Sequence, residues 1–113
     1  MADVTYINFD EGVKRMMNKP DFYIKMLNKF KADDNLKGVE TAMTAQDMEK
    51  AQVAVHTLKG LAGNLSLTEL FNQSLELETQ IKARAVNPDQ FAALKNIYAQ
   101  TLTEIEKVIV QYG

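Results

Sequence analysis

Several residue types are scarce in this sequence: its 113 residues include no cysteine, no tryptophan, two prolines and one histidine, His56. The lack of cysteine excludes a disulfide scaffold and a cysteine-based zinc site, and it fits a reducing compartment. No apolar run approaches the ~20 residues that span a membrane, and residues 1–10 lack the basic and apolar regions of a signal peptide. We therefore expect a cytoplasmic protein without a membrane partner.

An excess of charge of one sign is also missing. The chain has 13 Lys and Arg against 15 Asp and Glu, and its basic residues are scattered instead of forming a stripe. This distribution argues against nucleic acid as a partner. Hydrophobic residues make up 46% and charged residues 25%, which is ordinary for a soluble globular protein. We expect a single domain over residues 1–113 with one core.

The pattern of apolar residues predicts helices throughout. No stretch shows the strict alternation of a strand, whereas apolar residues recur at helical spacing in most of the chain. The segment "KADDN" interrupts this pattern once. Helices are expected at residues 8–17, at 20–30 with a short continuation at 39–43, at 44–65, at 66–85, and from 88 onward.

Capping patterns predict where three of these helices begin. Thr44 with Asp47, and Ser66 with Glu69, resemble capping boxes, and Asn87-Pro88 is typical of an N-cap followed by proline at the first helical position. The connections between the long helices are short, so neighbouring helices should be antiparallel. The expected fold is all-α, an antiparallel up-down four-helix bundle with a short extra N-terminal helix.

His56 is predicted to face solvent. On a helical wheel it lies opposite the apolar arc of its helix, and Gly60 and Gly63 lie on its side. A glycine inside a helix costs about 1 kcal/mol relative to alanine, so two exposed glycines are sensible if another molecule approaches the backbone there. A lone surface histidine commonly has no role, and that alternative stays open. The apolar arc comprises Ala51, Ala54, Leu58, Leu61, Ala62 and Leu65.

Two charged residues are candidates for acting with His56. Lys59 lies one turn away, where its charge would disfavour the imidazolium and stabilise an anion such as phosphate on the ring. Glu78 projects into the apolar arc of the next helix, and a buried acid needs a partner. If the two helices form a hairpin that turns near Ser66, Glu78 would lie level with His56. It could then accept a hydrogen bond from one ring nitrogen of His56, which would leave the other ring nitrogen free as a nucleophile. Alternatively, Glu78 lies at the edge of the arc and reaches water. That arc comprises Leu67, Leu70, Phe71, Leu75, Leu77 and Ile81.

The segment "AVHTLKGLAGNLSLTELFNQSLELE" resembles the signature of histidine-containing phosphotransfer (HPt) domains, and "FDEGVKRMMNKPDFYIKMLNKF" is similar to their N-terminal half. These domains are four-helix bundles that relay phosphoryl groups between receiver domains. The resemblance implies that His56 is phosphorylated, that Lys59 neutralises phosphoryl charge and that Gly60 admits the receiver. Glu78 matches a position where the family often has Gln or Glu bonded to the histidine. Ser66 departs from a common glycine, for which the capping box with Glu69 offers a local reason.

The resemblance implies that the chain accepts a phosphoryl group from a phospho-aspartyl receiver and passes it to another, without a cofactor of its own and as a monomer. Its partners would be response-regulator receiver domains and a hybrid sensor histidine kinase, with Mg²⁺ supplied by the receiver. A kinase activity of its own is not expected, because no Gly-rich phosphate loop follows a strand. A metal site is disfavoured by the single histidine and the lack of cysteine. The alternative function is a non-catalytic helical adaptor. The expected docking surface comprises Gln52, Val53, Gly60, Gly63 and Asn64.

Overall fold

The computed structural model of the chain describes residues 5–112 and is all-helical, as expected. The first four residues of the segment that was searched for a signal peptide lie outside this range. Among residues 5–112, no helix combines the length and the hydrophobicity needed to cross a membrane. The six helices are α1 (Phe9–Arg15), α2 (Pro20–Ala32), α3 (Lys37–Thr44), α4 (Met48–Asn64), α5 (Thr68–Lys82) and α6 (Pro88–Tyr112).

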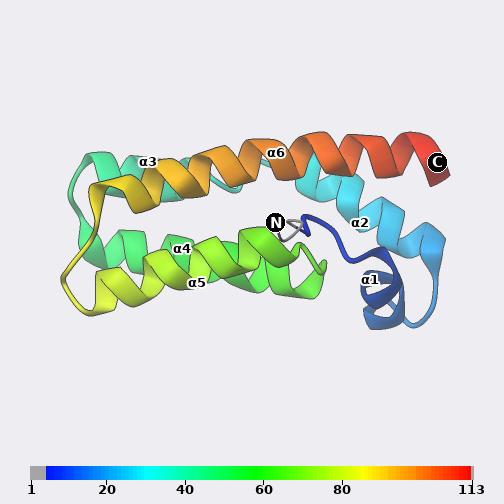
Figure 1. Ribbon diagram of the computed structural model, residues 1–113, viewed down its shortest axis with the longest axis horizontal. Helices are drawn as coiled ribbons and strands as arrows, with labels where there is room; N and C mark the ends of the chain where they lie inside the picture. The colour runs from blue at the N-terminus through cyan, green and yellow to red at the C-terminus, as the bar shows by residue number, and fades with distance from the viewer. Residues whose placement is uncertain (1–4, 113) are drawn as a thin grey trace.

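The helices form an up-down bundle in which α2 and α3 together make one of the four columns (Figure 1). Helix α4 packs on α5 and α3, α5 packs on α6, and α6 packs on α2, which closes the bundle. Helix α1 is the expected extra N-terminal helix and contacts α2. The core residues are Tyr23, Leu27, Phe30, Val39, Ala42, Ala51, Val55, Leu58, Ala62, Leu65, Leu67, Leu70, Leu77, Ile81, Leu94, Tyr98 and Ile105.

The break between α2 and α3 falls at the predicted interruption. Asp33 has extended backbone (φ −87°, ψ 138°), which ends α2. Asn35 then bridges the gap: its side-chain amide donates to Phe30 O at 3.1 Å, and its backbone N–H donates to the Tyr98 hydroxyl at 3.2 Å. Side-chain and backbone bonds therefore satisfy groups that the interrupted helix leaves free.

Helix α1 is fixed by a close approach to α2. A Cβ on Gly12 would lie 2.2 Å from Cζ of Tyr23, so only glycine fits between the two helices. The Tyr23 hydroxyl donates to Leu65 O at 2.5 Å, which joins α2 to the end of α4. The Phe9 ring stacks on Tyr112 with centroids 4.3 Å apart, so α1 also contacts the end of α6.

The predicted capping box at Thr44 is wrong. Thr44 is the last residue of α3, and Asp47 is the N-cap of α4, with its Oδ1 accepting the Lys50 N–H at 3.1 Å. Between them Gln46 takes φ 57°, and the Asp47 N–H donates to Ala42 O at 2.9 Å. This bond closes the end of α3 with a left-handed residue, a helix end that the pattern of polar residues did not indicate.

The predicted capping box at Ser66 is also wrong. Ser66 has φ 54° and follows the end of α4, while the Leu67 N–H donates to Ala62 O at 2.8 Å. Its hydroxyl donates to Glu11 Oε1 at 3.0 Å instead of capping α5. The Glu69 N–H donates to Thr5 O at 3.0 Å. The left-handed conformation explains why glycine would suit position 66.

In α5 and α6, one prediction from the sequence pattern is confirmed and two are wrong. Asn87 Oδ1 accepts the Asp89 N–H at 2.9 Å, so the predicted N-cap of α6 is present. Helix α5 ends at Lys82, three residues before the predicted end, because Arg84 takes φ 55°. Leu75 was placed in the buried arc of α5, but its side chain is exposed (43%).

Candidate functional site

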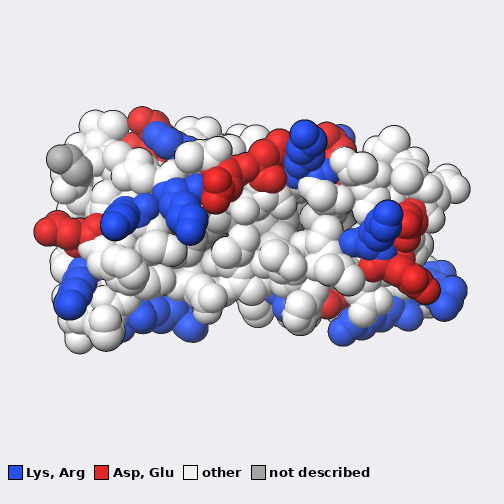
Figure 2. Space-filling model, turned by 180° about the vertical axis from the view of Figure 1, so that it is seen from behind, with Lys and Arg blue, Asp and Glu red and all other residues white. Residues whose placement is uncertain are grey.

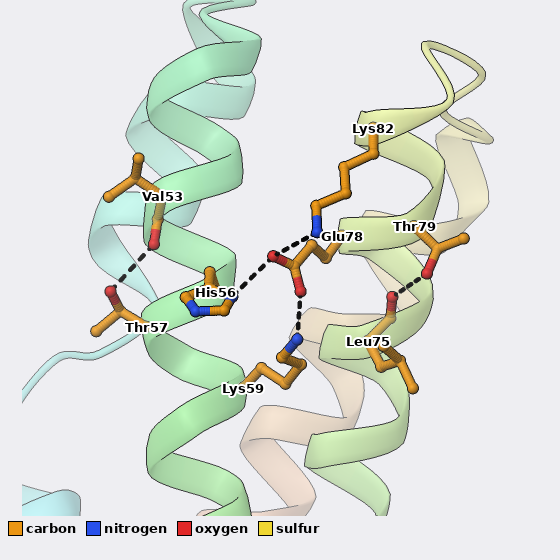
Figure 3. Close-up of polar contacts among 8 residues, drawn as sticks. All are labelled: Val53, His56, Thr57, Lys59, Leu75, Glu78, Thr79 and Lys82. Carbon is orange, nitrogen blue, oxygen red and sulfur yellow. Dashed lines mark hydrogen bonds and ion pairs between the residues drawn. The ribbon is translucent and has the colours of Figure 1, made fainter.

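His56 lies in the middle of α4 on the side that faces α5, with its side chain 66% exposed (Figure 3). The antiparallel packing of α4 and α5 brings it beside Glu78, which is 22 residues away in the sequence. Its Nδ1 is 2.9 Å from Glu78 Oε2. Of the two positions left open for Glu78, the structure has the buried one, level with the histidine.

The Glu78 carboxylate is buried, with its side chain 3% exposed, and positively charged groups surround it. Lys59 Nζ donates to Oε1 at 2.6 Å, and Lys82 Nζ lies 3.7 Å from Oε2, the oxygen that His56 contacts. Burial raises the pKa of Glu78, but hydrogen bonds from Lys59 and His56 and the nearby Lys charges outweigh it, so the pKa falls below its ordinary value of 4.5. Glu78 is therefore ionised at neutral pH.

An ionised Glu78 determines which ring nitrogen of His56 carries the proton. A carboxylate accepts hydrogen bonds and cannot donate them, so the Nδ1 that contacts Glu78 must carry the hydrogen. In the neutral ring the lone pair is then on Nε2. Figure 3 shows this second nitrogen on the opposite side of the ring from Glu78. In its neutral form the ring therefore presents the lone pair of Nε2 on the side away from Glu78, in an orientation set by the bond to Glu78.

Lys59 contacts Glu78, a bond that its position in the sequence did not indicate. It was expected to stabilise an anion on the ring, but its ammonium is bonded to Glu78 and its side chain is only 20% exposed. Sequence reasoning also missed Lys82. Its signal was available, because Glu78 and Lys82 have the i,i+4 spacing at which helix side chains meet.

The residues of the expected docking surface are not all exposed in the structure. A Cβ on Gly60 would meet nothing within 4 Å, so this glycine opens onto free space beside His56. A Cβ on Gly63 would lie 3.3 Å from the Phe71 ring of α5. The expectation that both glycines face solvent is therefore wrong for Gly63, whose small size leaves room for a packed aromatic ring. Asn64 is exposed at the end of α4.

A shallow pocket of about 290 Å³ lies next to the histidine, on the side toward the start of α4. Val53 is 69% exposed at its edge, and Gln52 is half-buried. The Thr57 hydroxyl is turned back along the helix, donating to Val53 O at 3.0 Å. The pocket is lined by Gln52, Val53, His56, Thr57, Glu78 and Lys82.

Charged groups of both signs lie around one face of the molecule. Figure 2 shows Lys and Arg intermixed with Asp and Glu toward the two ends and the upper edge of one face, and an uncharged area in its middle. In the part of the chain that the structure describes, no three His, Cys, Asp or Glu side chains gather as metal ligands would. The His56–Glu78 pair is therefore the arrangement with the clearest chemical use.

Comparison with known families gives a match to the Hpt domain over residues 26–104, which is more than two thirds of the chain. The chain belongs to the Hpt domain family. Its all-helical bundle with an additional N-terminal helix agrees with that membership, and the resemblance stated from the sequence is confirmed. No curated protein and no solved structure matches the chain.

Proposed function

We propose that this chain is a phosphoryl carrier in which His56 accepts a phosphoryl group from the phospho-aspartate of one receiver domain and passes it to another. Membership of the Hpt family supports a role in two-component phosphorelays. The observation that most supports His56 as the acceptor is its 2.9 Å contact with the buried carboxylate of Glu78. In the neutral ring, that contact places the lone pair on Nε2, on the side away from Glu78.

Transfer is an in-line displacement. The Nε2 lone pair attacks phosphorus, the bond from phosphorus to the aspartyl oxygen breaks, and the aspartate leaves as a carboxylate. Because Nδ1 keeps its hydrogen, the phosphorylated ring carries a positive charge, which the Glu78 carboxylate stabilises. Passing the group on is the reverse of this step. The receiver supplies Mg²⁺ and the acidic residues around its aspartate, so the carrier needs no cofactor of its own.

The expected partners are response-regulator receiver domains and a hybrid sensor histidine kinase, bound by a cytoplasmic monomer. The open space above Gly60 lets a receiver approach the helix backbone beside the ring. Val53 supplies an exposed apolar contact one turn before His56, and Gln52 and Asn64 supply polar ones. Gly63 packs on Phe71 of α5, so the residues around it, and not Gly63 itself, would contact a receiver.

The test is transfer from a panel of phosphorylated receivers to the parent chain and to His56→Gln. We expect acid-labile label on the parent and none on the variant. Melting should be nearly unchanged, because the ring is largely exposed and outside the core. Asn96→Gln on the exposed side of α6 is the matched control and should be labelled like the parent. Undiminished label on His56→Gln would refute the proposal, and receivers that bind the parent without labelling it would support the adaptor instead.

A further inference from the structure

Lys82 is a charged residue of the site for which the transfer reaction as described has no use. It lies one turn after Glu78 on α5, with its ammonium 3.7 Å from Oε2 and its side chain 56% exposed. Among the described residues, Glu78 is the one carboxylate within 4.0 Å of it. Its contact is longer and more exposed than that of Lys59, which is 2.6 Å from Oε1 and 20% exposed. Lys59 is therefore the closely bonded lysine of Glu78, and Lys82 is a second, more distant one.

Once the ring is phosphorylated, two anions lie near Lys59: the Glu78 carboxylate and the phosphoryl group on His56. The ammonium of Lys59 lies on the Glu78 side of the ring, whereas Nε2 is on the other side (Figure 3). To approach a phosphoryl group on Nε2, Lys59 must weaken or leave its bond to Glu78. A carboxylate that is 3% exposed and loses Lys59 keeps the positively charged ring as a partner but lacks a closely bonded lysine, and the loss of one partner from a buried ion pair is unfavourable.

We propose that Lys82 is a positioning residue that takes over the Glu78 carboxylate when Lys59 turns to the phosphoryl group on His56. The inference rests on the function proposed above. Lys82 is suited to this exchange because its long side chain is 56% exposed and its ammonium already lies near the oxygen that His56 contacts. Glu78 thereby stays ionised and keeps its bond to Nδ1 in both states of the ring.

The experiment uses phosphoramidate as a small phosphoryl donor, so that no receiver has to dock. Nε2 forms the new bond to phosphorus, the phosphorus–nitrogen bond of the donor breaks, and ammonia leaves. Labelling rates are compared for the parent, Lys82→Met, Lys82→Arg and Lys107→Met. Lys107→Met is the matched control because it removes the same charge from an exposed ion pair with Glu104 on α6.

We expect Lys82→Met to be labelled about threefold more slowly, as befits the loss of one partly exposed ion pair. Lys82→Arg should restore the rate, and Lys107→Met should equal the parent. A second readout follows the ¹⁵N signals of the lysine ammonium groups by NMR. On phosphorylation of the parent, proton exchange at Lys82 should slow and that at Lys59 should change, whereas Lys107 should not respond.

The outcomes separate this inference from the function beneath it. A parent chain that acquires no label from phosphoramidate or from any receiver contradicts the proposed function itself. A parent that is labelled on His56, with Lys82→Met labelled equally fast and the Lys82 ammonium unaffected by phosphorylation, overturns the exchange of cations alone. In that case Lys59 interacts with both the phosphoryl group and Glu78 without leaving Glu78.

Discussion

Gly60 and Gly63, the two glycines that follow His56 in α4, should gain different amounts of stability from the same substitution. Gly60→Ala adds a methyl group to an exposed helix position where nothing lies within 4 Å. Gly63→Ala adds the same group 3.3 and 3.4 Å from two ring atoms of Phe71. Both changes bring the same improvement in helix propensity, so any difference between them measures the packing of Gly63 on α5.

The magnitude for Gly60→Ala follows from propensity alone. Replacing glycine by alanine within a helix stabilises it by about 1 kcal/mol. With an unfolding entropy of about 2.1 cal/mol/K per residue, the gain corresponds to about 4 °C in Tm for a chain of 113 residues. For Gly63→Ala the close approach to Phe71 must be relieved by a shift of the ring, which offsets much of the gain. We expect its Tm to rise by less than half as much.

Thermal unfolding followed by circular dichroism, with urea unfolding as a second measure, tests both values. A Gly60→Ala variant that is no more stable than the parent would refute the placement of Gly60 in open space. Equal gains for the two variants would refute the packing argument for Gly63.

Gly60→Gln tests function as well as stability. This variant should also be more stable than the parent, yet impair transfer from a receiver, because its side chain stands where the partner approaches. Full-rate transfer would contradict the role of Gly60 in docking.

Three further predictions concern other contacts. Because the pKa of Glu78 is lowered in the folded chain, its ionisation stabilises the fold above its ordinary pKa near 4.5, and this contribution is lost as pH falls below that value; urea unfolding between pH 7 and 3 should show a smaller loss for Glu78→Gln than for the parent. Asp47→Ala removes the N-cap of α4 and should cost about 1 kcal/mol in urea unfolding, whereas Thr44→Ala should cost less than half of that if the structure, and not the capping box, is right. Tyr23→Phe leaves the buried Leu65 carbonyl without its donor and should cost about 1–3 kcal/mol; an unchanged stability would show that this bond contributes nothing.

The fold was predictable where the signal is local or repeats along the chain. Helical spacing of apolar residues indicated every long helix and the interruption before α3, and the Asn87-Pro88 start of α6 needs only adjacent residues. The wrong helix ends are those where a residue other than glycine takes a positive φ, as Gln46, Ser66 and Arg84 do. At Ser66 this end comes with a tertiary contact, the hydrogen bond from its hydroxyl to Glu11, 55 residues away. No local pattern carries that information.

The sequence predicted His56, Lys59 and Glu78 as residues of the candidate site, but it predicted neither Lys82 nor most of the contacts among these side chains. The helical wheel placed His56 at the surface, and the hairpin placed Glu78 level with it. Sequence alone could not decide whether Glu78 turns inward or toward water, because it lies at the edge of the apolar arc. Nor could it show that Lys59 is bonded to Glu78, since that contact depends on the distance between two packed helices.

His56 and Glu78 belong to one helical hairpin, and this has a consequence for how the chain is synthesised and how it varies. A chain leaving the ribosome has made every group of the site once residue 82 has been added, before any of α6 exists. The loop that joins the two helices is short, so pairing them costs little closure entropy. The side chains that contact one another at the histidine come from α4 and α5, so substitutions in α2 or on the far side of α6 should change the stability of the bundle without removing any of these contacts. Stability and the chemistry proposed for His56 can therefore be altered separately by natural variation.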